Sequence, residues 1–390
     1  MRIGIVLPSV PAYSETFFNT KIKGLQEQGH TVLLFINPGT EIPNSRYKVI
    51  QLPKVSGSRL QIIRNSLFCL SKAIVFHFPT VCKLYQLDTK DNISFSKKLK
   101  NSIVNSVFYG HNLDWIHFGY GTLAIGKENV AEAIGAKMGV SFRGFDIGIY
   151  PLKNKKCYNL LWEKVDKVHV ISDDIKNLVL INGFKYENKI VKICPAIDTS
   201  FFSNSSIEKT SNQIPQLITV ARLNWKKGLE YTLEALFILK EKGIRFYFTI
   251  IGDGKEFEKL KFAVNQLKLT NQVSFLGKLS ATEVKNKLES ADLYIQYSLQ
   301  EGFCNAVLEA QAMGKICIVS DAEGLTENVV DGITGFVVPK GNSVALAKKI
   351  KDVLALSLEQ KNTISKNAIE RVQTNFNSIN QQKKWLTFFN

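Results

Sequence analysis

Short apolar runs alternate with helical segments along nearly the whole chain, and this alternation restricts the fold more than any other feature. Helices are expected near residues 19–28, 228–240, 255–267 and 344–354. Strands are expected near residues 3–7, 32–36, 115–118, 140–143, 168–172, 190–194, 217–221, 246–252, 273–276, 293–296, 316–320 and 336–338. Repeated β-α-β units produce parallel sheets with helices on both faces. Such sheets bind ligands beyond the carboxyl ends of their strands.

The chain of 390 residues is long enough for two domains, each with its own core. We predict a first Rossmann-like domain over residues 1–200. A polar linker over residues 201–213 and a second Rossmann-like domain over residues 214–377 would follow. Residues 378–390 are apolar for a chain end and predict a helix. This helix either crosses back onto the first domain or caps its own.

The net charge of +16 is concentrated in the first half of the chain. Residues 1–195 contain 26 Lys and Arg against 14 Asp and Glu, whereas residues 196–390 contain 24 against 20. A basic half favours an anionic partner such as a membrane surface, and no motif points to nucleic acid. Because no uninterrupted apolar run reaches about 18 residues, we expect no transmembrane helix. Six scattered cysteines and an N-terminus without a signal peptide predict a cytoplasmic location.

Residues 301–314, E-G-F-C-N-A-V-L-E-A-Q-A-M-G, combine two carboxylates with a predicted helix. The helix is expected to begin near Asn305, a good N-cap residue, and to end at Gly314. A helix N-terminus beside a buried strand presents unpaired backbone N–H groups, which suit a phosphate. Glu301 in the loop and Glu309 about two turns along the helix are placed to accept hydrogen bonds from sugar hydroxyls. The competing interpretation of Glu309 is a solvated helix residue.

Two further segments place cations and glycines at strand ends. In L-I-T-V-A-R-L-N-W-K-K-G at 217–228, Arg222 ends an apolar run and Lys227 precedes a helix. A guanidinium fork and an ammonium charge at these positions suit a pyrophosphate. The alternative is a surface basic cluster, to which we assign Lys226. The segment F-T-I-I-G-D-G at 248–254 ends in a glycine turn but lacks the third glycine of a dinucleotide fingerprint.

In order and spacing, these segments resemble those of glycosyltransferase family 4. Its members have the GT-B fold, in which two Rossmann-like doubly wound parallel-sheet domains face a cleft, and they retain the anomeric configuration of the donor. The resemblance implies that Arg222 and Lys227 hold the donor diphosphate and stabilise the leaving group. It also implies that Glu301 holds the donor sugar and Glu309 the nucleotide ribose. The other implied donor-site residues are Gly252, Gly254, Lys278, Gly302, Phe303, Cys304 and Asn305.

Two segments of the first half resemble a subset of the same family that builds bacterial exopolysaccharide and lipopolysaccharide. In the first, S-E-T-F, Ser14 is suited to cap a helix and Glu15 to complement its dipole. In the second, S-F-R-G-F-D-I, Arg143 stands where many relatives have histidine, and Asp146 is retained. Arg143 would pair with Asp146 or meet a phosphate, so no histidine role is transferred to this position. We assign these four residues to the acceptor side.

Two features of the first half leave alternatives open. His117, in W-I-H-F-G-Y-G, ends a predicted strand and is either a catalytic polar group near the reaction centre or a hydrogen-bonded core histidine. Residues 59–84 repeat Leu, Ile and Phe at helical spacing with basic residues between them. This pattern is typical of an amphipathic helix at a membrane interface and also of a helix that covers a Rossmann sheet.

Together, these features predict a retaining, metal-independent glycosyltransferase that uses a nucleotide diphosphate sugar and no cofactor. The expected reaction moves a hexosyl unit to a lipid-linked acceptor of a bacterial surface polysaccharide. No D-x-D triplet occurs in the sequence, so the basic residues would stabilise the diphosphate without a metal. The predicted location is cytoplasmic and peripheral on the inner face of the membrane, with anionic lipid as a further partner. The alternatives are a GT-B epimerase or phosphorylase, and a non-catalytic carbohydrate- or lipid-binding relative.

Overall fold

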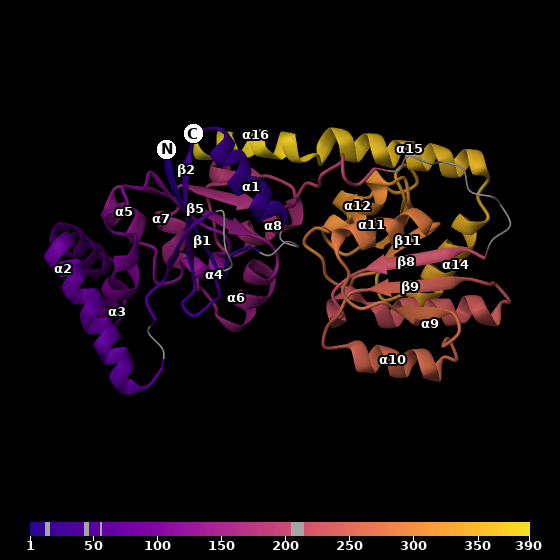
Figure 1. Cartoon of the computed structure of the whole chain (residues 1–390), viewed down its shortest axis with the longest axis horizontal. Coiled ribbons are helices and arrows are strands. Elements are labelled where there is room, and N and C mark those ends of the chain that lie inside the picture. The colour runs from indigo at the N-terminus through magenta and orange to yellow at the C-terminus, as the bar shows by residue number, and fades with distance from the viewer. Residues whose placement is uncertain (12–15, 43–46, 55–56, 204–213) are drawn as a thin grey trace. The chain divides into compact units, whose positions relative to one another are not determined.

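The structure, a computed structural model, describes residues 1–11, 16–42, 47–54, 57–203 and 214–390. These residues form two compact units (Figure 1). Unit 1 comprises Met1–Ile193 and Gln382–Asn390, and unit 2 comprises Cys194–Gln381. Each unit contains one parallel sheet, which confirms the predicted pair of α/β domains. Residues 204–213 of the predicted linker lie outside the described residues.

The sheet of unit 1 has the strand order β3-β2-β1-β4-β5-β6-β7. Its strands are β1 (Arg2–Leu7), β2 (Thr31–Ile36), β3 (Lys48–Gln51), β4 (Trp115–Phe118), β5 (Lys137–Phe142), β6 (Lys167–Val170) and β7 (Ile190–Lys192). The central strands are apolar and buried, as expected of a parallel sheet covered on both faces. The edge strand β3 was not predicted, because K-V-I-Q is short and half polar.

The helices of unit 1 follow the strands in the expected alternation. They are α1 (Thr16–Glu27), α2 (Arg59–Lys90), α3 (Phe95–Asn105), α4 (Gly121–Ala124), α5 (Val130–Ile134), α6 (Tyr150–Lys153), α7 (Asn159–Lys164) and α8 (Asp173–Ile181). The last helix, α16 (Ser378–Phe389), carries the chain from unit 2 back to unit 1. Its residues Trp385, Phe388 and Phe389 pack into the core of unit 1 beside Ile3 and Trp115.

The helix α2 is unlike a helix that covers a sheet, because much of its apolar surface is exposed. It is 32 residues long, and most of the large apolar side chains in its first half are exposed. A kink at His77, which has non-helical φ and ψ angles, lies two residues before Pro79. Among the described residues, Leu60–Lys90 is the one helix long and apolar enough to cross a membrane, by length and composition only. The expectation of no transmembrane helix rested on uninterrupted apolar runs, and basic residues interrupt the run in this helix.

The sheet of unit 2 has the strand order β10-β9-β8-β11-β12-β13. Its strands are β8 (Gln216–Val220), β9 (Tyr247–Ile251), β10 (Val273–Phe275), β11 (Leu293–Gln296), β12 (Ile316–Ser320) and β13 (Phe336–Val338). The order reverses direction between β8 and β11, which are hydrogen-bonded neighbours. Such a reversal opens a crevice outside the carboxyl ends of the two strands, where doubly wound sheets bind their ligands.

The helices of unit 2 cover its sheet and connect its strands. They are α9 (Leu229–Glu241), α10 (Phe257–Gln266), α11 (Ala281–Ser290), α12 (Asn305–Ala312), α13 (Leu325–Asn328), α14 (Ser343–Leu354) and α15 (Leu358–Asn375). A short helical turn, η4 (Trp225–Lys227), precedes α9. Serine N-caps with capping boxes begin α11 at Ser280 and α15 at Ser357.

Candidate active site

The predicted donor residues of unit 2 lie in the loops that follow neighbouring strands. Arg222 follows β8, the Gly252–Gly254 turn follows β9, and Glu301 follows β11. Because β9, β8 and β11 are adjacent and parallel, their carboxyl ends meet at one edge of the sheet. The sheet therefore brings together segments that lie far apart in the sequence.

The glycines of this edge allow two loops to touch through their backbones. A Cβ on Gly252, at φ +136°, would lie 1.9 Å from the Ala221 carbonyl oxygen, and one on Gly254 would lie 2.3 Å from the Leu223 oxygen. The Leu223 N–H donates to the Asp253 oxygen at 2.9 Å. The Gly-Asp-Gly turn is thus required for close packing against the segment that carries Arg222.

Three cations converge on this edge. Arg222 is exposed, whereas Lys226 and Lys227 are half-buried. Lys227 forms an ion pair with Glu301. Burial opposes the charge on Lys227, but the Glu301 carboxylate outweighs it and raises the pKa of Lys227. Burial lowers the pKa of Lys226, and the Arg222 and Lys227 charges add to this, while Glu301 acts in the opposite direction.

Lys226, which the sequence assigns to a surface basic cluster, is half-buried and also makes backbone contacts. Its carbonyl oxygen accepts hydrogen bonds from Leu299 N at 2.6 Å and Gln300 N at 3.3 Å. Its own N–H donates to the Asn224 side chain at 3.1 Å. Lys226 therefore connects η4 to the loop that carries Glu301.

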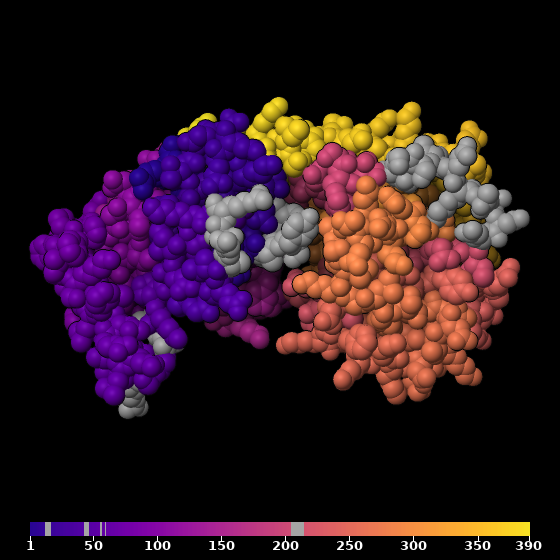
Figure 2. Space-filling view, in the orientation of Figure 1, coloured from indigo at the N-terminus to yellow at the C-terminus, as the bar shows by residue number. Residues whose placement is uncertain are grey.

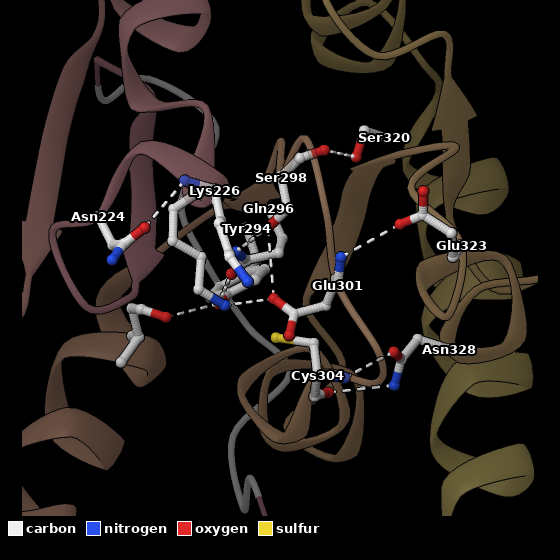
Figure 3. Close-up of polar contacts among 12 residues, drawn as sticks. Asn224, Lys226, Tyr294, Gln296, Ser298, Glu301, Cys304, Ser320, Glu323 and Asn328 are labelled. Atoms are coloured by element: carbon white, nitrogen blue, oxygen red, sulfur yellow. Dashed lines mark hydrogen bonds and ion pairs between the residues drawn. The ribbon is translucent and has the colours of Figure 1, made fainter. Parts of the chain in front are cut away.

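Glu301 is held from several directions (Figure 3). Its carboxylate accepts hydrogen bonds from Lys227 and from Ser298 Oγ, the latter at 3.4 Å. Its N–H donates to Glu323 Oε2 at 3.3 Å, and Glu323 is paired with Lys340 at 2.8 Å. The loop thus fixes the carboxylate beside the cations.

A buried chain of hydrogen-bonded polar side chains leads to Glu301 and was not predicted from the sequence. Tyr294 Oη donates to Gln296 Oε1 at 2.9 Å, and Gln296 Nε2 donates to Ser298 Oγ at 2.9 Å. Ser320 Oγ donates to the Ser298 carbonyl oxygen. Polar residues at the end of an otherwise apolar strand were the available signal: β11 reads L-Y-I-Q and is entirely buried.

The helix α12 begins at Asn305, as predicted, but its N-cap is Cys304 rather than Asn305. Asn328, which is fully buried, accepts from Cys304 N at 3.0 Å and donates to the Cys304 oxygen at 3.1 Å (Figure 3). The helix ends as expected, with Gly314 at φ +70°. The N–H groups of its first turn belong to the set that a helix leaves without intrahelical partners.

We expect Asn328→Ala to lower the free energy of unfolding by about 2–4 kcal/mol, because two backbone groups of Cys304 lose their buried partner. Urea denaturation measures this change. The matched control is Asn367→Ala, which removes one hydrogen bond to the Ile333 oxygen and should cost less than about 1 kcal/mol. Equal losses in the two variants would contradict a special role for Asn328.

Glu309 is half-buried on α12, and burial raises its pKa to about 7. Its charge contributes to the raised pKa values of the buried neighbours Tyr294 and Cys304. A carboxylate in this setting is costly for the fold, which disfavours the interpretation of Glu309 as an ordinary solvated residue. Perturbed carboxyl groups of this kind are concentrated at functional sites.

The remaining donor-site candidates differ in what they can offer a ligand. Phe303 is buried with its ring centre 5.6 Å from that of Phe376, and burial raises the pKa of the Cys304 thiol to about 12. Both side chains therefore serve packing, and the backbone N–H and carbonyl groups of Cys304 are already bonded to Asn328. The Gly302 oxygen lies against Gly324, where a Cβ would approach it to 2.0 Å. Lys278 is exposed and follows Gly277, whose oxygen accepts from Gly252 N at 2.8 Å.

In unit 1, the structure favours a core role for His117 over the catalytic role. His117 is completely buried, and its Nε2 lies 2.7 Å from Ser141 Oγ. Its ring packs against Trp385 and Phe388 of α16. Burial lowers the pKa of His117 well below its usual value, and the Lys21 charge adds to this effect. A strand-end histidine looks the same in sequence whether it faces a ligand or a returning helix.

The acceptor-side candidates are only partly described. Ser14 and Glu15 lie outside the described residues. The Arg143 guanidinium lies 3.8 Å from the Phe17 ring centre, and its Nε donates to the Gly119 oxygen at 3.3 Å. The buried Asp146 carboxylate accepts the backbone N–H groups of Arg143, Gly144 and Gly121 at 3.0 Å each. Asp146 thus organises the loop that presents Arg143.

Comparison with known proteins places this site in a family. The family model described as "Glycosyl transferases group 1" matches residues 202–371. In an alignment 403 residues long, gaps included, the chain is 28% identical to a Salmonella typhimurium protein named colanic acid biosynthesis glycosyltransferase WcaL. The alignment covers 98% of each chain. It is 29% identical to WcaL of Escherichia coli, covering 67% of this chain and 66% of that protein. It is 30% identical to the amylovoran biosynthesis glycosyltransferase AmsK of Erwinia amylovora, covering 65% and 64%.

Solved structures show the same fold over the whole chain. A glycosyltransferase from Rickettsia africae has a TM-score of 0.73 at 22% identity, covering 100% of this chain and 97% of its own. Anabaena HepE, solved with UDP and glucose, has a TM-score of 0.72 at 16% identity, covering 99% and 98%. The protein is therefore a glycosyltransferase of the GT-B fold. Its residues 202–371 belong to the glycosyl transferases group 1 family.

Proposed function

We propose that this protein is a retaining glycosyltransferase that moves a hexosyl unit from a nucleotide diphosphate sugar to a lipid-linked acceptor. The observation that carries the proposal is the convergence of Arg222, Lys226 and Lys227 with Glu301 at the carboxyl edge of the unit 2 sheet. Cations suit a diphosphate and carboxylates suit sugar hydroxyls, so one edge of the sheet matches both parts of such a donor.

Each residue has a proposed role. Arg222 and Lys227, with the first-turn N–H groups of α12, would hold the diphosphate. Glu301 would accept hydrogen bonds from the donor sugar, and Glu309 from the ribose. The Lys227–Glu301 ion pair supports this division, because it holds a phosphate-binding cation next to a sugar-binding carboxylate before the donor arrives.

The proposed reaction occurs on one face of the sugar. The acceptor hydroxyl oxygen bonds to the anomeric carbon on the side from which the nucleoside diphosphate departs, so the configuration is retained. The bond between the anomeric carbon and the phosphate oxygen breaks, and that oxygen takes the hydroxyl proton. Negative charge accumulates on the leaving diphosphate, and pre-placed cations stabilise it more in the transition state than in the bound donor.

The acceptor class is supported by the names of relatives. WcaL and AmsK are named for colanic acid and amylovoran biosynthesis. A Campylobacter jejuni relative, 30% identical over 182 residues and 47% of this chain, is named as a transferase acting on a diphospho-undecaprenol sugar. These names favour an acceptor of a bacterial surface polysaccharide carried on a lipid diphosphate. We therefore propose that the protein works in the cytoplasm at the inner face of the membrane.

The test is a panel of nucleotide sugars, first by thermal shift and then by transfer to a lipid-linked oligosaccharide extract. We expect one donor to stabilise the protein and to yield a product whose new linkage keeps the donor's anomeric configuration by NMR. Inverted configuration would contradict the retaining mechanism. Isomerised donor without transfer would indicate an epimerase, and binding without turnover would indicate a non-catalytic relative.

We also expect transfer to continue unchanged in the presence of EDTA. The physical reason is that Arg222, Lys226 and Lys227 would balance the diphosphate charge in place of a metal. Within the parts of the chain that the structure describes, no group of three His, Cys, Asp or Glu residues is placed to hold a metal ion. Loss of activity in EDTA that Mg²⁺ or Mn²⁺ restores would contradict this prediction.

A further inference from the structure

The helices α2 and α3 form a hairpin, residues 59–105, that projects from the rest of unit 1 (Figures 1 and 2). The first half of α2 exposes large apolar side chains at nearly every turn. Those with exposed fractions of 56–81% include Leu60, Ile63, Leu67, Phe68, Val75 and Phe76. An apolar surface this continuous is uncommon on a protein that meets only water.

The charge on the hairpin is mainly positive. It contains eight Lys and Arg residues against two acidic residues, Asp88 and Asp91. Asp88 is buried and accepts hydrogen bonds from Asn101 and Asn129. Asp91 is paired with Lys164 of α7 at 3.1 Å. The carboxylates therefore face inward, while Arg64, Lys72 and Lys83 are exposed on the same helix as the apolar side chains.

The kink in α2 separates an anchored half from a free half. Beyond Pro79, Leu84 and Asp88 are buried, and α2 packs against α3 and α5. At the kink, His77 lies against Gly110, where a Cβ would approach the imidazole to 2.6 Å. Before the kink, Ala73 is the one buried apolar residue between 60 and 76. The half of α2 before the kink, residues 59–76, is thus the free half, and the half after Pro79 holds it to unit 1.

The sheet topology excludes a membrane crossing by α2 in the folded protein. A single crossing would leave β1, β2 and β3 on one side of the membrane and β4 to β7 on the other. However, β1 pairs with both β2 and β4. Its residue Ile5 lies opposite Leu34 of β2 on one side and opposite His117 of β4 on the other. Strands of one hydrogen-bonded sheet cannot lie on opposite sides of a bilayer. The exposed apolar side chains of α2 must therefore be shielded from water in a way other than by crossing the membrane.

We propose that the free half of α2, together with the basic residues of the hairpin, lies flat in the interface of an anionic lipid bilayer. Helices that combine Leu and Phe with Lys and Arg bind such interfaces by burying apolar area and by attraction to acidic headgroups. The charge pattern disfavours a second copy of this chain as the cover, because two hairpins in contact would bring like charges together. The proposal extends the proposed function by naming the surface on which the acceptor would be met, and it rests on unit 1 alone.

The test is sedimentation of the full-length protein with vesicles of phosphatidylcholine, with and without phosphatidylglycerol. We expect binding to the anionic vesicles that decreases as salt is added. A combined Arg64→Gln, Lys72→Gln and Lys83→Gln variant should lower the partition coefficient on the order of 100-fold, since each charge near such a surface contributes about fivefold. The matched control is Lys242→Gln, Lys351→Gln and Lys366→Gln in unit 2, which removes the same charge and should bind like the wild type.

The apolar contribution is tested separately. Leu67→Ala, Phe68→Ala and Phe76→Ala together should lower binding at least about tenfold, because alanine preserves the helix and removes the inserted side chains. The control is Phe262→Ala, Val344→Ala and Leu358→Ala, which are equally exposed in unit 2. Melting temperature and nucleotide diphosphate binding, measured on the same samples, separate loss of membrane docking from loss of folding or of the donor site.

The depth at which α2 inserts into the bilayer distinguishes a helix that lies in the interface from one that spans the membrane. A tryptophan at Phe68→Trp should be quenched more by lipids brominated near the headgroup than by lipids brominated at the chain end. Deeper quenching by chain-end bromine would overturn the in-plane geometry. Equal binding to neutral and anionic vesicles, binding to neither, or a lipid-free dimer abolished by the triple alanine variant would each overturn the proposal.

Discussion

Arg222→Ala is expected to lower kcat about 100- to 1000-fold while the protein stays folded. Arg222 is exposed at the end of β8, so its removal leaves no cavity in the core. The loss comes from the transition state, in which the leaving diphosphate gains charge, and a single stabilising donor of this kind contributes about 3–4 kcal/mol. Steady-state kinetics with the donor found in the panel measure the effect.

The control for Arg222→Ala is Arg245→Ala. Arg245 is also exposed, but it precedes β9 and therefore lies at the opposite edge of the same sheet. Its removal makes the same change in net charge and should leave kcat within about twofold. Turnover near the wild-type rate in Arg222→Ala, or an equal loss in both variants, would falsify the assignment of Arg222 to the diphosphate.

Glu309→Gln is expected to stabilise the fold at alkaline pH and to weaken nucleotide binding. The folded pKa of about 7 lies above the ordinary value of 4.5, so the folded protein holds this proton more tightly than the unfolded chain. The resulting stability is fully present below pH 4.5 and is lost as pH rises through 7. A glutamine cannot ionise, and it should add about 1–3 kcal/mol at pH 8 and little at pH 5.

Nucleotide binding is expected to change in the opposite direction to stability. Loss of a carboxylate that accepts ribose hydroxyls should weaken nucleoside diphosphate binding by about 1.5–3 kcal/mol at pH 8. In the wild-type protein, affinity should fall as pH decreases through about 7, where Glu309 takes up its proton. Calorimetric titrations and urea denaturation at the two pH values measure both halves. Glu370→Gln, at an exposed position of α15, is the control and should change neither.

A variant that gains stability and keeps full nucleotide affinity would show that the buried carboxylate serves no ligand. A variant that loses both would show that Glu309 supports the fold instead. The combination of gained stability and lost affinity is the result expected where function maintains a costly group.

The architecture of unit 2 could be predicted closely from the sequence because its signals are local. Strand ends, a helix start and the Gly-Asp-Gly turn are short patterns, and a parallel sheet then places their ends at one edge. The predicted helices at 228–240 and 344–354 lie within one residue of α9 and α14. The prediction of Asn305 as the N-cap was wrong by one residue, because the N-cap is Cys304, whose backbone is held by Asn328 of α13, a residue distant in sequence.

Most strands of the first half were also predicted, but the roles of His117 and of residues 59–84 were not, because they depend on long-range contacts. The environment of His117 depends on Trp385 and Phe388, which are more than 260 residues away. The periodic apolar pattern of 59–84 correctly indicated a helix, but periodicity does not reveal whether an apolar face meets a sheet or solvent. That distinction requires the three-dimensional structure.

The return of α16 to unit 1 also sets an order of assembly during synthesis. The ribosome completes all of unit 2 before it makes Trp385, Phe388 and Phe389, yet these residues fill the core beside Ile3 and Trp115. Until they arrive, the face of the unit 1 sheet around His117 and His169 lacks its cover. Unit 2 is contiguous and is free to fold during translation, whereas unit 1, although made first, reaches its final packing last. A fragment that stops at Ile193 would therefore lack part of its own core.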